Sequence, residues 1–334
     1  MDNRVLVFDI GGTALRAGVY QKAAENLIRS ITRPTPSAWA AVQRTPEEIR
    51  ARLFAMMEEM GRELLEGASP VAVSVAFPGP IDGSGQVLGA PTVWGEADRE
   101  PFPLREALLA VWPAAAVGVL NDVTAAGYYY RRGEREDLCV ITVSSGIGHK
   151  VFIQGRPAVG TKGRGGEIGH LRVDFGDDAP RCECGGQGHL GAIASGRGTL
   201  LEARRLAAAD PAAFRLSKVY SLVGGDPQAI VNEAVAEAYR GADNWASTVV
   251  ERGAHYLGQA MAAIHVGVGV ERFVVFGGFA LALGERYRSA LVQAATTSCW
   301  DLGQSWDEMI ELGDQAVEAG LIGAGRFAVQ RLGG

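Results

Sequence analysis

The sequence predicts an α/β fold with two domains, and three observations lead to this prediction. Strand-like and helix-like segments alternate along most of the chain, a strand–glycine turn–strand pattern occurs twice, and 334 residues suffice for about two cores. Strands that alternate with helices favour mainly parallel sheets. We place the domains at 1–117 and 118–315, and expect a last helix, about 316–334, to pack back on the first domain.

The first half opens with a β-hairpin. Val5 to Ile10 is a short apolar run, Gly11-Gly12-Thr13 forms the turn, and Leu15 to Tyr20 resumes as a strand. The next predicted elements, in order, are a helix over 45–66 with apolar residues at helical spacing, a buried strand over 71–76 that stops at Pro78-Gly79-Pro80, a helix over 103–111, a strand over 116–120 ending at Asn121-Asp122, and a helical stretch over 123–130.

The second half begins with the same pattern. The strand Leu138 to Val143 ends in Ser144-Ser145-Gly146-Ile147-Gly148, and the strand Lys150 to Ile153 returns. This indicates a weak internal duplication, visible in organisation and not in identity. The later predicted elements are helices over 197–209, 227–239 and 243–267, a strand over 272–276 followed by Gly277-Gly278, and terminal helices.

Composition excludes several classes of function. A net charge of −6 and a pI near 5.5 argue against a nucleic-acid or anionic-membrane surface. The most apolar long segment, 261–283, is interrupted by Glu271-Arg272 and two glycine pairs, so it does not read as a membrane span. The first apolar run is too short for a signal peptide. We therefore expect a cytoplasmic protein without nucleic-acid or membrane partners.

Two of only four cysteines and two of only five histidines fall within twenty residues. His170, Cys182, Cys184 and His189 form a set of four soft ligands of the kind that tetrahedral zinc accepts. The Cys-x-Cys spacing is tighter than the usual two to four intervening residues. On spacing alone, a zinc site and a chance gathering in a glycine-rich loop stay equally open.

Several glycine turns at strand ends could surround phosphate groups. The segment Asp9 to Thr13 offers backbone amides without a Cβ, a carboxylate for Mg²⁺ and a hydroxyl donor. Ser145, Gly146 and Gly148 could hold phosphates from the second domain, and Gly277-Gly278 could let an adenine ring approach the backbone. The alternative for each is an ordinary turn.

Asn121-Asp122 also has two interpretations. An Asp that follows a strand and precedes a helix can simply cap that helix. In the same position, Asp122 could instead act as a general base that accepts the proton of an attacking hydroxyl group.

Taken together and in this order, the segments resemble the ROK family of sugar kinases, repressors and open reading frames. The matching segments cover the chain from end to end and are Asp9 to Thr13, Pro78-Gly79-Pro80, Asn121-Asp122, Ser145 to Gly148, Gly166-Glu167-Ile168-Gly169-His170, Cys182-x-Cys184-Gly185-x-x-Gly188, Ala194-Ser195-Gly196, Gly277-Gly278 and Gly320 to Ala324.

The resemblance implies an actin-like (ribonuclease H-like) two-domain ATPase fold with its active site in the interdomain cleft. It implies a glucokinase-like enzyme that uses ATP and Mg²⁺ to phosphorylate a primary hydroxyl group, with Asp122 as catalytic base. Substrate would be bound by Asn121, Glu167, His170, Gly79 and Thr92. Phosphates and nucleotide would be bound by Asp9, Gly11, Gly12, Thr13, Ser145, Gly146, Gly148, Gly277 and Gly278. Structural zinc would be held by His170, Cys182, Cys184 and His189. Members of the family usually form dimers or tetramers, so a homodimer or homotetramer is expected.

The chain departs from the family where the sugar is recognised. His189 replaces the third zinc cysteine, and Gly191 replaces a glutamate that contacts a sugar hydroxyl near the anomeric carbon. Thr92 stands in place of the usual asparagine and Leu120 in place of a glutamate. The residues expected at the reacting end of the substrate site are thus retained, whereas those expected to recognise the sugar have changed. We expect an aminohexose such as kanosamine or a sugar-like C7 cyclitol as substrate, and an ordinary glucokinase is the alternative.

A ROK-type sugar sensor or transcriptional regulator is the main rival from another class. Such regulators carry a winged helix before the Asp-x-Gly-Gly-Thr hairpin, whereas the first strand is expected here by about residue 4. A non-catalytic sensor would not need to keep both Asp9 and Asp122. The residues therefore favour an enzyme over a sensor.

Overall fold

The computed structural model describes residues 4–39, 44–95, 100–314 and 317–331. The chain divides into two compact units. Unit 1 comprises Met1–Arg132, Pro157–Gly165 and Ala316–Gly334, and unit 2 comprises Gly133–Arg156 and Gly166–Gln315. The expected boundary at residue 117 falls within β5 (Ala116–Asn121), and both β5 and the following helix α4 (Asp122–Tyr130) belong to unit 1. Residues 315–316 and 332–334 of the expected last helix lie outside the described residues.

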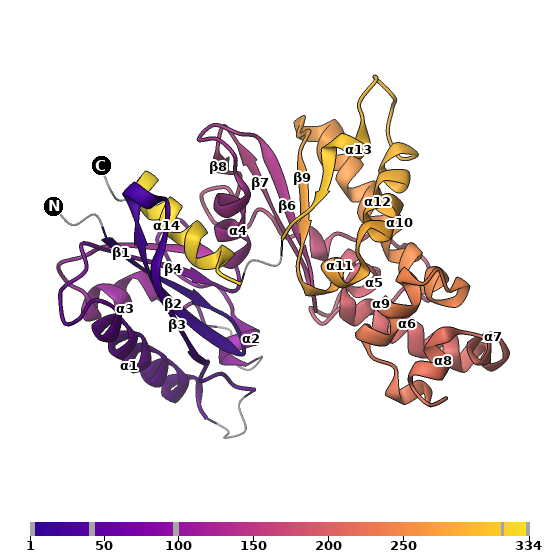
Figure 1. Ribbon diagram of the computed structural model, residues 1–334, viewed down its shortest axis with the longest axis horizontal. Coiled ribbons are helices and arrows are strands. Elements are labelled where there is room, and N and C mark those ends of the chain that lie inside the picture. Colours follow the sequence, from indigo (N-terminus) through magenta and orange to yellow (C-terminus); the bar gives the residue numbers. More distant parts are fainter. Residues whose placement is uncertain (1–3, 40–43, 96–99, 315–316, 332–334) are drawn as a thin grey trace. The chain divides into compact units, whose positions relative to one another are not determined.

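The sheet of unit 1 has the strand order β3-β2-β1-β4-β5 among the described residues. Its strands β1, β2 and β3 are antiparallel neighbours, whereas β4 and β5 run parallel to β1. The strands are β1 (Arg4–Ile10), β2 (Ala14–Gln21), β3 (Asn26–Pro34), β4 (Ala72–Phe77) and β5 (Ala116–Asn121) (Figure 1).

The sheet of unit 2 has the order β10-β9-β6-β7-β8. It too begins with an antiparallel pair, β6 and β7, and adds β9 and β10 in parallel on the other side of β6. The strands described are β6 (Leu138–Val143), β7 (Ile147–Ile153), β8 (Arg156–Pro157), β9 (Phe273–Phe276) and β10 (Ile310–Leu312). Read from β8 to β10, this order matches unit 1 strand for strand, so the duplication predicted from the sequence is present in the topology.

Two expectations about the sheets were wrong. The sheets are mixed and not mainly parallel, because each unit starts with a hairpin whose strands must be antiparallel. Strands β3, β8 and β10 were not foreseen. Most side chains of β3 are exposed and two are arginines, so it lacks the apolar alternation that identifies a half-buried strand, whereas β8 and β10 have only two and three residues.

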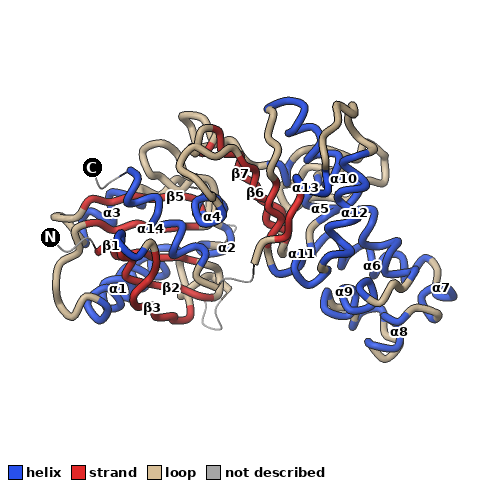
Figure 2. The backbone as a smooth tube through the Cα atoms, turned by 45° about the horizontal axis from the view of Figure 1, so that its top comes forward, coloured by secondary structure: helices blue, strands red, loops and turns tan. Residues whose placement is uncertain are grey.

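The helices of unit 1 cover both faces of its sheet. Leu6, Phe8 and Ile10 of β1 share a core with helix α1, whereas α14 and α4 pack together on the opposite face (Figure 2). The helices of this unit are α1 (Pro46–Leu64), α2 (Pro91–Trp94), α3 (Leu104–Val111), α4 (Asp122–Tyr130), α14 (Ala319–Arg331) and the 3₁₀ turn η1 (Lys22–Ala24).

Unit 2 is more helical. Its core joins β6 and β9 to the long helix α10. The helices described are α5 (Leu190–Ala194), α6 (Gly196–Ala209), α7 (Pro211–Arg215), α8 (Lys218–Leu222), α9 (Asn232–Arg240), α10 (Asn244–Val268), α11 (Gly278–Leu283), α12 (Glu285–Thr296), α13 (Trp306–Met309) and the 3₁₀ turns η2 (Ile168–His170) and η3 (Pro227–Ala229). Within the described residues, no helix combines the length and apolar character needed to span a membrane.

Candidate functional site

The first glycine turn carries a mostly buried carboxylate. Asp9, near the end of β1, accepts a hydrogen bond from Arg16 Nη1 at 3.2 Å. Burial raises the pKa of Asp9, and the charge of Arg16 opposes this shift. The opposite side of the carboxyl group lies against Gly320 in α14, where a Cβ would be 2.6 Å from Asp9 Cγ. Only glycine fits at position 320 while the Asp9 carboxyl group occupies this place.

The turn itself is braced by short contacts. Gly11 N donates to Ala14 O at 2.9 Å, and Thr35 Oγ1 donates to Gly11 O at 2.7 Å. A Cβ on Gly12 would be 2.9 Å from the carbonyl oxygen of Thr92. The structure thus brings Gly12, expected to bind phosphate, next to Thr92, expected to bind substrate.

Asp122 lies at the first position of α4, directly after β5. The helix cap is Asn121, whose Oδ1 accepts from Val123 N and Thr124 N at 3.0 and 3.2 Å. Oδ1 of Asp122 accepts from Val123 N and from Asn121 Nδ2, both at 2.8 Å. Because Asn121 provides the side-chain cap, the structure weakens the interpretation of Asp122 as the capping residue.

Asn121 also connects this site to the turn at Pro78-Gly79-Pro80. Its Nδ2 donates to Gly79 O at 3.0 Å as well as to Asp122. Gly79 has φ +102°, and a Cβ there would be 2.0 Å from Gly89 O, so only glycine fits. Both amide hydrogens of Asn121 are directed at protein atoms. A substrate contact from this nitrogen would replace one of these bonds.

In unit 2, the hairpin turn between β6 and β7 carries Ser145 and Gly146, and Gly148 lies in β7. Ser144 O accepts from Gly196 N at 2.8 Å, at the start of α6. After β9, Gly277 has φ +98°, and its Cβ would be 2.7 Å from Thr142 Oγ1 of β6. Gly277 thus allows close packing against β6, whereas a Cβ on Gly278 would meet no described atom within 4 Å.

Glu167 lies in a loop that is held by two buried basic side chains of β7. Lys150 Nζ contacts Glu167 Oε1 at 3.0 Å and donates to Gly166 O at 3.2 Å. His149 Nδ1 accepts from Ile168 N at 3.1 Å. Burial, reinforced by the charge of Lys150, lowers the pKa of His149 to about 4, so this imidazole is neutral near pH 7.

The four predicted metal ligands come together. One ligand atom from each of His170, Cys182, Cys184 and His189 lies within 4.8 Å of all the others. Cys182 Sγ is 3.7 Å from His170 Nδ1, and Cys184 Sγ is 3.2 Å from His189 Nδ1. Zinc at about 2.3 Å from sulfur and about 2.0 Å from nitrogen needs ligands roughly 3.5 Å apart. The residues therefore fit a tetrahedral zinc ion.

A cavity of 220 Å³ connects this cluster with the second glycine turn. Its lining includes Gly146, Cys182, Gly191 and Arg197. Arg197 pairs with Glu183 and donates to Ser145 O at 3.4 Å. A Cβ on Gly191 would be 3.0 Å from Gly169 O, so the glycine lets α5 approach η2 closely.

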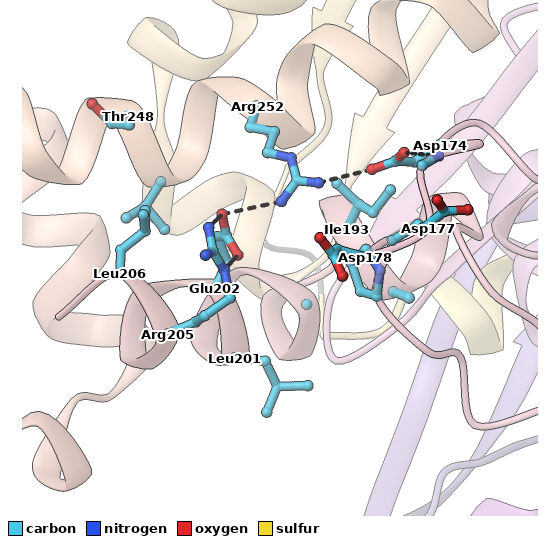
Figure 3. Close-up of a pocket in the computed structure, with 16 residues that line it drawn as sticks. Asp174, Asp177, Asp178, Ile193, Leu201, Glu202, Arg205, Leu206, Thr248 and Arg252 are labelled. Carbon is cyan, nitrogen blue, oxygen red and sulfur yellow. Dashed lines mark hydrogen bonds and ion pairs between the residues drawn. The ribbon is translucent and has the colours of Figure 1, made fainter. Parts of the chain in front are cut away.

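A second cavity, of 890 Å³, lies elsewhere in unit 2, and none of the predicted site residues lines it. Arg252 of α10 occupies its wall and pairs with Asp174 Oδ2 at 2.9 Å and Glu202 Oε1 at 3.0 Å (Figure 3). Asp174 N and Val173 N both donate to Gly188 O, beside the metal cluster. The ion pairs therefore anchor the base of the metal-binding loop to α6 and α10.

Within each unit the structure groups the predicted residues. In unit 1, Gly12 lies against Thr92, and Asn121 is hydrogen-bonded to both Gly79 and Asp122. Unit 2 assembles the metal cluster and Glu167. Sequence reasoning missed Lys150 and Arg197 as members of these groups. The scarcity of lysine, with four in the chain, was the available signal for Lys150.

A family model described as ROK family matches residues 5–331. The chain belongs to the ROK family. It is 40% identical to the C(7)-cyclitol 7-kinase of Streptomyces hygroscopicus subsp. limoneus over 98% of this chain and 95% of that protein. It is 30% identical to the kanosamine kinase of Amycolatopsis mediterranei over 84% of this chain and 82% of the relative.

Solved structures agree with this membership. A ROK hexokinase from Thermus thermophilus matches with a TM-score of 0.76 and 26% identity, covering 99% of both chains. A ROK glucokinase from Streptomyces griseus, in complex with glucose and AMPPNP, matches with a TM-score of 0.74 and 26% identity over 98% of this chain and 99% of that one. The predicted actin-like α/β fold is confirmed, and the chain is a carbohydrate kinase.

Proposed function

We propose that this kinase transfers the γ-phosphoryl group of ATP to the hydroxymethyl group of a sugar-like C7 cyclitol. The observation that carries the proposal is the 40% identity to a C(7)-cyclitol 7-kinase along 98% of the chain. Glycine at position 191 supports it independently. The family glutamate expected there would accept a hydrogen bond from a sugar hydroxyl near the anomeric carbon, and a carbocyclic substrate has no anomeric carbon.

Asp122 is the proposed general base. Hydrogen bonds from Asn121 Nδ2 and Val123 N fix its Oδ1 and so orient the carboxylate. In the proposed step, Asp122 accepts the proton of the substrate hydroxyl group while the oxygen of that hydroxyl group bonds to the γ-phosphorus. The bond from the γ-phosphorus to the β,γ-bridging oxygen breaks and releases ADP. Phosphoryl transfer needs little covalent help, so positioning supplies most of the rate.

Each of the two glycine turns is proposed to bind phosphate groups. ATP as donor is supported by the AMPPNP complex of the Streptomyces griseus glucokinase. Gly12 and Gly146 carry no Cβ, which permits close approach of phosphate oxygens to their amides, whereas Gly11 N already donates to Ala14 O. Mg²⁺ would neutralise charge on the phosphates, with Asp9 as the residue that holds it directly or through water.

Zinc is proposed as a structural brace. His170, Cys182, Cys184 and His189 would hold it, and His170 lies three residues after Glu167 in the loop expected to bind substrate hydroxyls. The metal would then orient substrate-binding residues and take no part in the chemical step.

The test is a substrate panel with purified enzyme and ATP. It compares kcat/KM for glucose, mannose, N-acetylated hexosamines, kanosamine and a valienol-type C7 cyclitol. We expect the cyclitol to exceed glucose at least tenfold. Comparable turnover of glucose would identify an ordinary glucokinase, and a preference for kanosamine would favour the function of the 30% identical relative.

Gly191→Glu sharpens the test because it restores the family carboxylate. It should raise kcat/KM for glucose and lower it for the cyclitol, each about tenfold, the size expected for a charged hydrogen bond of roughly 1.5 kcal/mol. Gly191→Ala is the matched control, since its Cβ makes the same close contact with Gly169 O without the carboxylate. Equal effects of the two variants would contradict a role for this position in recognition.

A further inference from the structure

Lys150 is a buried cation beside a residue expected to bind substrate. Only 3% of its surface is exposed. A buried ammonium group is costly unless it is paired and hydrogen-bonded. Here Nζ meets Glu167 Oε1 at 3.0 Å and Gly166 O at 3.2 Å. The charge of Lys150 is therefore maintained by the loop that carries Glu167.

The loop is shaped around this side chain. Gly166 has φ +90°, and a Cβ there would lie 2.5 Å from both Cδ and Nζ of Lys150. A side chain at position 166 would displace the ammonium, so this placement of Lys150 requires glycine there. His149 supports the same loop as a neutral acceptor from Ile168 N. Of these two basic residues, Lys150 supplies the positive charge.

The ion pair with Lys150 leaves Glu167 able to accept a hydrogen bond from a hydroxyl group but makes the carboxylate less attractive to a cationic group. About a third of the Glu167 side chain, 35%, is exposed, so the carboxylate remains reachable. Its negative charge is balanced by Lys150, and Gly191 adds no second carboxylate. A neutral hydroxyl can donate to Glu167, whereas a substrate ammonium near it would also face the Lys150 cation.

We propose that Lys150 is a specificity-determining residue that makes the enzyme select neutral polyols over cationic amino sugars. This inference rests on the proposed function and narrows its substrate class. It assigns the discrimination to an interaction with Glu167 and not to the shape of the pocket. The lysine is a positioning residue, because it acts on substrate through Glu167.

The experiment measures kcat and KM at pH 7 for a valienol-type cyclitol, glucose and kanosamine with wild type, Lys150→Met and Lys218→Met. Lys218, exposed and paired with Glu237, is the matched control. Wild type and Lys218→Met should prefer the neutral substrates to kanosamine at least tenfold. Lys150→Met should reduce this preference at least tenfold through the KM values, since Glu167 then attracts an ammonium group.

The outcomes separate the inference from the proposed function. If Lys150→Met lowers kcat/KM equally for all substrates, the lysine is merely structural and the inference is overturned. If wild type phosphorylates kanosamine as efficiently as the cyclitol, the inference fails while polyol kinase activity stands. If wild type phosphorylates none of the substrates, the proposed function itself fails.

A second variant covers the case in which Lys150→Met does not fold. Glu167→Gln retains the lysine but removes the balancing charge, so discrimination against kanosamine relative to glucose should rise about tenfold. Unchanged or reduced discrimination in this variant contradicts the inference.

Discussion

The two units share a strand topology but carry different charged groups in the strands of their opening hairpins. In unit 1, Asp9 is a mostly buried carboxylate paired with Arg16, and burial raises its pKa. In unit 2, β7 carries the buried Lys150 and the neutral His149. On the roles proposed above, unit 1 would supply the carboxylates for proton transfer and for Mg²⁺, and unit 2 would supply Glu167 for substrate binding together with the zinc brace.

The largest expected effect comes from Asp122→Asn in unit 1. The amide cannot accept the hydroxyl proton, so kcat should fall about 10³-fold while KM changes little. Steady-state kinetics and calorimetric binding of the acceptor substrate measure the two quantities. Glu106→Gln, an exposed carboxylate on α3 of the same unit, should leave both unchanged. Retained activity in Asp122→Asn would mean that the base lies elsewhere.

Cys184→Ser tests the proposal that the Cys/His cluster of unit 2 binds zinc and thereby supports substrate binding. Removing one thiolate should abolish stoichiometric zinc binding, measured by elemental analysis, and raise KM for substrate about tenfold to a hundredfold. Cys299→Ser, a cysteine of the same unit outside the metal cluster, is the control. A fall in kcat with unchanged KM would instead place the cluster in the chemical step and break the proposed division of work.

Gly320→Ala probes the packing of Asp9. The new Cβ would lie 2.6 Å from Asp9 Cγ, so the helix or the carboxylate must shift. We expect a loss of about 2 kcal/mol in the free energy of unfolding, together with weaker Mg²⁺-ATP binding. Gly267→Ala is the helical control, because its Cβ would meet no described atom within 4 Å. Similar denaturation midpoints for the two variants would argue against close packing at Asp9.

The last prediction concerns the pH dependence of stability. The pKa of His149 falls from 6.5 to about 4 on folding, so the unfolded chain binds more protons between these values. This residue's contribution is complete above pH 6.5 and is lost as the pH falls toward 4. His149→Gln should reduce the change in the free energy of unfolding between pH 7 and pH 5 by about 2 kcal/mol. His255→Gln, exposed on α10, should match wild type in urea titrations at pH 5 and 7.

The sequence predicted the alternation of strands and helices, the duplication and the ligands of the metal cluster because each leaves a local pattern. Periodicity marks buried strands, and Cys and His are rare enough that a gathering of them is informative. Strand β3 left no such pattern because it is largely exposed. The roles of Lys150 and Arg252 depend on partners distant in the chain, Glu167 for one and Asp174 with Glu202 for the other, so no local pattern could reveal them.

The compact spacing of the proposed zinc ligands has a consequence for the linkage between metal binding and folding. All four lie between residues 170 and 189, so a short segment could chelate zinc even in the unfolded chain with little loop-closure entropy. A metal that binds both states adds less to global stability than its affinity implies. Removing zinc should therefore weaken substrate affinity strongly while it lowers the melting temperature only slightly. The loop would then form its metal site independently of the rest of the enzyme.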